Sequence, residues 1–184
     1  MNKTLSVAVL VLVILGVGVF IFTRNIDEDI PAPTTHTVFD GKNSTFTIDG
    51  ISTTLIHGIS VASATPGSAS KITTRYFGNE ATGDLNGDGL RDTAFLVTQD
   101  MGGSGLFYYV VVALQTASGY TTTNAFLVGD RIAPQSTEIH TDSQELYVNF
   151  AERKAGEPMS TPPSIGATLF LKVTPAGTLE GLMQ

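Results

Sequence analysis

The chain has 184 residues, with 17 acidic against 10 basic side chains and neither cysteine nor tryptophan. The lack of cysteine excludes disulfides, thiol catalysis, a lipid-modified N-terminal cysteine and thiolate metal sites, so oxygen ligands are the expected metal chemistry. Residues 25–184 carry eight of the basic residues and all 17 acidic ones, a net charge of −9, which disfavours nucleic acid and anionic lipid as partners.

The first predicted element is a transmembrane helix over residues 5–22. This run of 18 residues holds no charge and spans about 27 Å as a helix, close to the thickness of a bilayer core. Lys3 precedes it and an acidic run at 27–29 follows it, which favours a cytoplasmic N-terminus and an extracytoplasmic C-terminal domain. We therefore interpret residues 1–24 as a single-pass membrane anchor. The alternative is a cleaved signal peptide with a secreted product, although no small-x-small site closes the run.

Residues 25–37 are interpreted as a linker, because acidic residues followed by Pro31, Pro33 and threonines cannot bury apolar area. Residues 38–184 are predicted to form one extracytoplasmic β domain, at the cell surface or in the periplasm. About 150 residues suffice for one such core.

The strand pattern predicts an all-β fold, either an antiparallel sandwich or a partly open barrel. Asp49-Gly50 between two strand-forming runs predicts a type I′ hairpin turn, and the unbroken apolar run 107–114 predicts a central strand buried on both faces. Segments 60–70 and 153–165 are predicted loops. The predicted strands are 44–48, 51–57, 69–77, 93–99, 106–115, 120–128, 136–141, 145–150 and 166–173.

The chemical centre of the sequence is the segment 84–92. Oxygen-bearing side chains fall at alternate positions, Asp84, Asn86 and Asp88, and Asp92 closes the segment, while the Leu90 carbonyl occupies the position between the last two. A hard cation such as Ca²⁺ takes six to eight oxygens, and a glycine-containing tight turn presents them locally. Mg²⁺ is disfavoured because it usually takes fewer protein ligands. The competing interpretation is an ordinary solvated turn.

The segment departs from the EF-hand, because Phe95 stands where the twelfth-position glutamate belongs and a strand is predicted to follow. It resembles instead the DxDxDGxxD calcium loop of the FG-GAP or integrin-type repeat. The resemblance covers about fifteen residues and a single copy, so it implies the loop chemistry and not a propeller. More widely, the order DLNGDG, GGSGLFYYVVVAL and GDRIAPQ resembles bacterial membrane-anchored or secreted β-proteins with no assigned activity.

Other polar residues carry less specific signals. Glu80, Asp100 and Asp130 are either further ligands or surface charge, and Asp130-Arg131 is either a local ion pair or a turn. The loop around Ser104 lacks the second glycine of a nucleophile elbow, and the three histidines stand alone, so no catalytic residue is predicted.

Three functions remain open from the sequence. The first is a calcium-binding module for binding, adhesion or scaffolding at the cell envelope, with a protein or glycan partner. The second is a subunit of an envelope filament or machine. The third is a hydrolase of envelope polymers, which would need a carboxylate partner for Glu138, Glu145 or Glu152.

Overall fold

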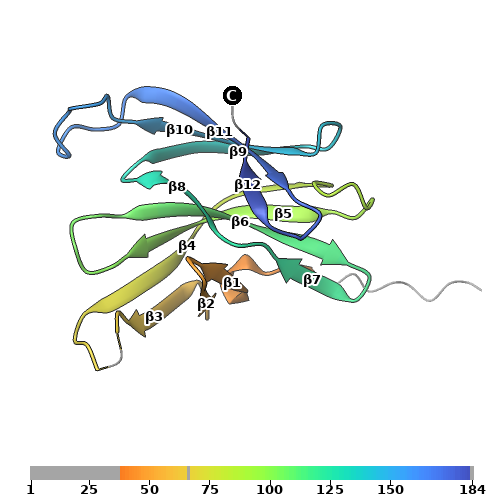
Figure 1. Ribbon diagram of the computed structural model, residues 1–184, viewed down its shortest axis with the longest axis horizontal. Helices are drawn as coiled ribbons and strands as arrows, with labels where there is room; N and C mark the ends of the chain where they lie inside the picture. Colours follow the sequence, from red (N-terminus) through yellow and green to blue (C-terminus); the bar gives the residue numbers. More distant parts are fainter. Residues whose placement is uncertain (1–37, 66, 183–184) are drawn as a thin grey trace, which may run out of the picture. The chain divides into compact units, whose positions relative to one another are not determined.

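A computed structural model describes residues 38–65 and 67–182. The chain divides into two units, residues 1–36 and 37–184, and the second is an all-β unit of three antiparallel sheets (Figure 1). The predicted anchor, residues 1–24, and the predicted linker, residues 25–37, lie outside the described residues. Within the described ranges, no helix has the length and apolar character needed to cross a membrane.

In the described ranges, one 3₁₀ turn precedes twelve strands. A 3₁₀ turn, η1 (Gly41–Asn43), comes first, capped by Asp40. The strands are β1 (Thr45–Ile48), β2 (Ile51–Thr54), β3 (Ile59–Ser63), β4 (Lys71–Gly83), β5 (Asp92–Asp100), β6 (Phe107–Thr116), β7 (Gly119–Thr122), β8 (Phe126–Asp130), β9 (Ala133–His140), β10 (Glu145–Glu152), β11 (Ile165–Val173) and β12 (Leu179–Gly181).

The largest sheet has the order β3-β4-β5-β6-β7, with β8 also paired to β6. The second has the order β12-β11-β10-β9, and the third is the β1–β2 hairpin. One apolar cluster joins Leu96 and Val110 of the six-stranded sheet to Leu146 and Leu171 of the four-stranded sheet. The four-stranded sheet therefore covers one face of the six-stranded sheet (Figure 1).

The β1–β2 hairpin covers part of the opposite face. Phe46 and Ile48 of β1 share a second cluster with Phe95 and Val97 of β5 and with Val111 of β6. Strand β5 therefore contributes alternate residues to two cores, because successive side chains of a strand point to opposite faces.

The prediction of a central strand at 107–114 is confirmed. Strand β6 pairs with β5 along one edge and with β7 and β8 along the other, and its six middle residues are buried. The type I′ turn is also confirmed, since Asp49 and Gly50 have φ of 48° and 80°, both in the left-handed region that this turn needs.

Two strands were missed by the sequence prediction. All of strand β3 except Ile59 falls in the segment 60–70 that was predicted to be a loop, because its Ser and Ala residues weaken the apolar alternation of Ile59 and Val61. Strand β12 has only three residues and is held by pairing with β11, for which the sequence carries no local signal.

Several strand boundaries were also wrong, since the predicted strand 51–57 ends at Thr54 and the predicted strand 136–141 begins at Ala133. The predicted strand 69–77 continues to Gly83, because Gly78 and Asn79 adopt positive φ and form an irregularity inside β4 rather than its end. The predicted strand 120–128 is interrupted at Thr123, whose N–H and hydroxyl both bond the backbone of Val112. Strands β7 and β8 therefore pair with different halves of β6.

Candidate metal loop

The predicted calcium loop joins two neighbouring strands of the six-stranded sheet. Strand β4 ends at Gly83 and β5 begins at Asp92, and these two residues are direct partners in the antiparallel ladder. A strand therefore follows the loop, as the sequence predicted, and the turn between the strands is fixed at both ends by sheet pairing.

Asp84 organises the first half of the loop through both carboxylate oxygens. One oxygen accepts the N–H of Gly87 at 2.7 Å and the other accepts the N–H of Gly89 at 2.8 Å. Both glycines have φ of 81°, which residues with a side chain rarely adopt. The two glycines of the motif are therefore explained by the backbone path that wraps around Asp84.

Asn86 and Asp88 form the exposed tip of the loop. The side-chain oxygen of Asn86 accepts the N–H of Asp88, and the side-chain NH₂ of Asn86 donates to the Asp88 carboxylate at 3.0 Å. The other Asp88 oxygen accepts the N–H of Leu90 at 2.8 Å. These turns hold the polar side chains of the tip close to the backbone, as Asx turns do.

Asp92 differs from Asp84, Asn86 and Asp88 because it is fully buried. Its two oxygens accept the N–H of Leu85 and the N–H of Gln115, each at 2.9 Å. Burial raises the pKa of the Asp92 carboxyl, the two backbone bonds lower it, and the nearby carboxylates of Asp88 and Asp84 raise it further. Asp92 thus ties the loop to β6. Among the described residues, no basic side chain forms an ion pair with this buried carboxylate.

A second segment touches the loop, which sequence spacing did not indicate. The side-chain amide of Gln144, in the turn between β9 and β10, packs against Gly87 so closely that a Cβ there would collide with it. Gln144 lies more than fifty residues away in the sequence, so only the packing of the sheets brings this side-chain amide, with its nitrogen nearest, to the loop. Arg91 is directed elsewhere and donates to the Thr82 hydroxyl.

A metal site requires several ligand side chains to converge on one point, and not only to lie near one another. In residues 38–65 and 67–182, no group of three or more acidic or histidine side chains is gathered closely enough to hold a metal ion. The carboxylate oxygens of Asp84, Asp88 and Asp92 are directed to backbone amides of the loop and of β6. The oxygens are present, but their arrangement is that of a hydrogen-bonded turn.

The three further acidic residues considered as ligands each have another local partner. Glu80 accepts a hydrogen bond from the Tyr76 hydroxyl, and Asp100 accepts the N–H of Gly102 within the β5–β6 turn. Asp130 forms an ion pair with Arg131 at 2.8 Å, which confirms the ion-pair interpretation of that dipeptide.

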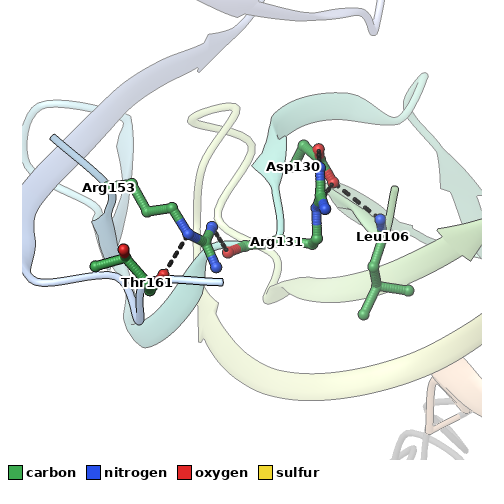
Figure 2. Close-up of polar contacts among 5 residues, drawn as sticks. All are labelled: Leu106, Asp130, Arg131, Arg153 and Thr161. Carbon is green, nitrogen blue, oxygen red and sulfur yellow. Dashed lines mark hydrogen bonds and ion pairs between the residues drawn. The ribbon is translucent and has the colours of Figure 1, made fainter. Parts of the chain in front are cut away.

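Figure 2 shows that this ion pair belongs to a larger polar cluster. Asp130 also accepts the N–H of Leu106, while the Arg131 carbonyl accepts a bond from Arg153, which in turn donates to the Thr161 carbonyl. The pKa of Asp130 is held below its usual range, chiefly by the bond from Arg131. The cluster ties three connecting segments together and has the contacts of a structural clamp.

The glutamates considered for catalysis lie in the four-stranded sheet. Glu138 accepts bonds from Ser136 and Asn149, and Glu145 accepts a bond from Tyr147 and pairs with Lys172 at 3.5 Å. These contacts are therefore made within one strand, as for Ser136 and Tyr147, or with the neighbouring strand, as for Asn149 and Lys172. His140 lies beside them, 3.7 Å from Glu138, whereas His57 is in the tight turn after β2; His36 lies outside the described residues.

No protein-family model, curated protein or solved structure matches this chain. The fold and the loop geometry are therefore the basis of any functional assignment.

Proposed function

We propose that the chain is a membrane-anchored, extracytoplasmic calcium-binding β module that serves binding, adhesion or scaffolding at the cell envelope. The two facing sheets are classed as a sandwich in this proposal, because one continuous apolar cluster lies between them. Asp84, Asn86, Asp88, Asp92 and the Leu90 carbonyl are the proposed ligands.

The observation that carries the calcium proposal is the charge at the buried end of the loop. Asp92 is fully buried, and the carboxylates of Asp84 and Asp88 are near enough to raise its pKa. A divalent cation would offset two of these three charges, and oxygen donors of this kind suit a hard cation such as Ca²⁺. Loading would require the carboxylates to turn from backbone amides towards the ion.

The anchored location rests on the apolar run 5–22 and its flanking charges, and the binding role is the function that the β domain with a single calcium-type loop favours. Extracellular calcium modules bind with dissociation constants of about 10⁻⁴ to 10⁻³ M, so ambient calcium would keep such a loop loaded. The ion would then act structurally, coupling the loop to the β5 strand that follows it.

The test is thermal unfolding of the full-length chain, purified in a mild detergent, with 10 mM Ca²⁺ or with chelator. A dissociation constant in the range above predicts about 1.4–2.7 kcal/mol of added stability, from the ratio of ion concentration to that constant. For a domain of this size, the gain corresponds to a rise in Tm of about 3–10 °C. Equal Mg²⁺ is expected to give a smaller rise.

Asp88→Ala tests whether the gain comes from the loop, and Asp100→Ala is its matched control. Each aspartate accepts one N–H from the residue two positions later, but Asp100 lies in the β5–β6 turn. The calcium-dependent rise should vanish in Asp88→Ala and persist in Asp100→Ala. A rise that survives Asp88→Ala, or no rise in the parent chain, would refute the proposed site.

A further inference from the structure

The β2–β3 hairpin begins with regular pairing and then opens. Ile56 and Ile59 exchange backbone hydrogen bonds of 3.0 and 3.2 Å across the tight turn at His57-Gly58. Beyond this bridge, β2 pairs only with β1 and β3 pairs only with β4, so the two strands diverge into different sheets. The open hairpin leaves a gap between two strand edges.

The edges that face this gap carry backbone groups without a strand partner among the described residues. The backbone bonds at Gly58 and Ala64 lie at the two ends of the β3–β4 ladder, so the even-numbered residues of β3 are the ones that bond to β4. The backbone N–H and C=O groups of the odd-numbered Val61 and Ser63 therefore point away from β4. Bonding alternates along β2 in the same way. Because the odd-numbered Leu55 bonds to Ser44, the backbone N–H and C=O groups of the even-numbered Ser52 point away from β1. The bridge at Ile56 and Ile59 shows that these two outward edges face each other.

A cavity of about 180 Å³ lies at the gap. Its floor includes Thr74 and Gln99, cross-strand partners of β4 and β5 that are both more than nine-tenths buried. The Gln99 amide donates to the Thr74 hydroxyl at 3.3 Å, which leaves the Gln99 carbonyl oxygen as an acceptor in the floor. Ile51 and Met101 line the rim and are 65% and 42% exposed.

The chemistry of this groove selects one kind of occupant. Its unpaired strand edges match an extended backbone, its apolar rim matches an aliphatic side chain, and its volume is that of a side chain rather than of a folded domain. Asp49 is the one charged residue of the lining, and residues 25–184 carry a net charge of −9. Asp49 and the net negative charge favour a basic residue at the Asp49 end of the groove, whereas the Lys71 ammonium, which donates to the Ser63 hydroxyl at 2.9 Å, places a positive charge at the β3 edge.

We propose that the open β2–β3 hairpin binds a short extended peptide of a partner protein by strand addition. The peptide pairs with the outward groups of Val61 and Ser63, inserts one aliphatic side chain between Ile51 and Met101, and places a basic side chain at Asp49. The proposal deepens the binding role proposed above and names its partner class. It involves none of the calcium-loop residues, so the two proposals fail separately.

The test selects ligands for the full-length chain from a displayed library of random twelve-residue peptides, in 10 mM Ca²⁺. Selected sequences should combine alternating aliphatic residues with a lysine or arginine, and synthetic copies should bind in a fluorescence anisotropy titration. N-methylation of alternate peptide residues should weaken binding at least tenfold in one register and less than twofold in the other. That asymmetry is specific to strand pairing.

Variants of the protein locate the site. Val61→Pro removes an outward N–H without breaking the β3–β4 ladder, and Ala62→Trp fills the groove, so each should weaken peptide binding at least tenfold. Val61→Thr keeps the N–H and should stay within twofold, and melting curves should show that all three variants remain folded.

Three outcomes would overturn the proposal. They are a library without enriched peptides, enriched peptides that bind Val61→Pro as well as the parent chain, and equal binding in both N-methylated registers. A concentration-dependent dimer that Val61→Pro abolishes, without peptide binding, would assign the edge to a second copy of the chain instead.

Discussion

Asp92 should be the most sensitive polar residue of the loop, independently of calcium. It is fully buried and accepts two backbone N–H groups, from Leu85 before the loop and from Gln115 in β6. Asp92→Ala leaves the buried Leu85 N–H and the part-buried Gln115 N–H without an acceptor, at about 1–3 kcal/mol each. Removing a desolvated carboxylate beside two others offsets part of this loss, so we expect a net destabilisation of about 2–4 kcal/mol.

The measurement is urea unfolding followed by far-ultraviolet circular dichroism, in the presence of chelator so that no ion contributes. Asp92→Asn restores one acceptor but turns an N–H₂ group towards the other donor, so it should lose about 1–3 kcal/mol. Asp88→Ala, at an exposed position, is the control and should lose less than about 1 kcal/mol. A loss below about 0.5 kcal/mol for Asp92→Ala would refute the anchoring role of this carboxylate.

Two further predictions test the loop backbone and the polar clamp. Gly87→Ala should lower the free energy of unfolding in urea by about 1–2 kcal/mol, because Gly87 has a positive φ and Gln144 must move to make room. Gly103→Ala is the control and should be near neutral, because a Cβ there meets no neighbour. Equal losses in the two variants would contradict this reasoning. For Asp130, whose pKa is lowered in the fold by Arg131, the ion pair stabilises above the ordinary aspartate pKa and is lost as pH falls through the lowered pKa. The unfolding free energies of the parent chain and Asp130→Asn should therefore converge between pH 7 and pH 2 in a pH series, and a constant difference would argue against the ion pair.

Local signals determined much of the β architecture. Asp49-Gly50 specified its turn because few residue pairs tolerate two positive φ values, and the apolar run 107–114 specified a central strand because only two-sided burial stabilises it. The segment 84–92 likewise specified a tight turn between strands, since the glycines and the Asx-forming side chains act on their own backbone.

Pairing between distant strands was not encoded locally. Strand β3 is held by β4 although its own sequence favours a loop, and β12 exists only because β11 offers an edge. The interruption between β7 and β8 depends on the hydrogen bond between Thr123 and Val112, which the hydrophobic pattern of the sequence does not predict. Such elements are set by the partner strand rather than by propensity.

The sequence by itself therefore determined the strand-rich class, the loop that carries the acidic residues, and the oxygen-only chemistry open to it. Tertiary structure alone decided that Asp92 is buried while Asp88 is exposed, that Gln144 packs against the loop, and that the β2–β3 hairpin opens into a groove. The physical reason is that burial and facing strand edges depend on residues far apart in the chain, whereas turn chemistry depends on neighbours.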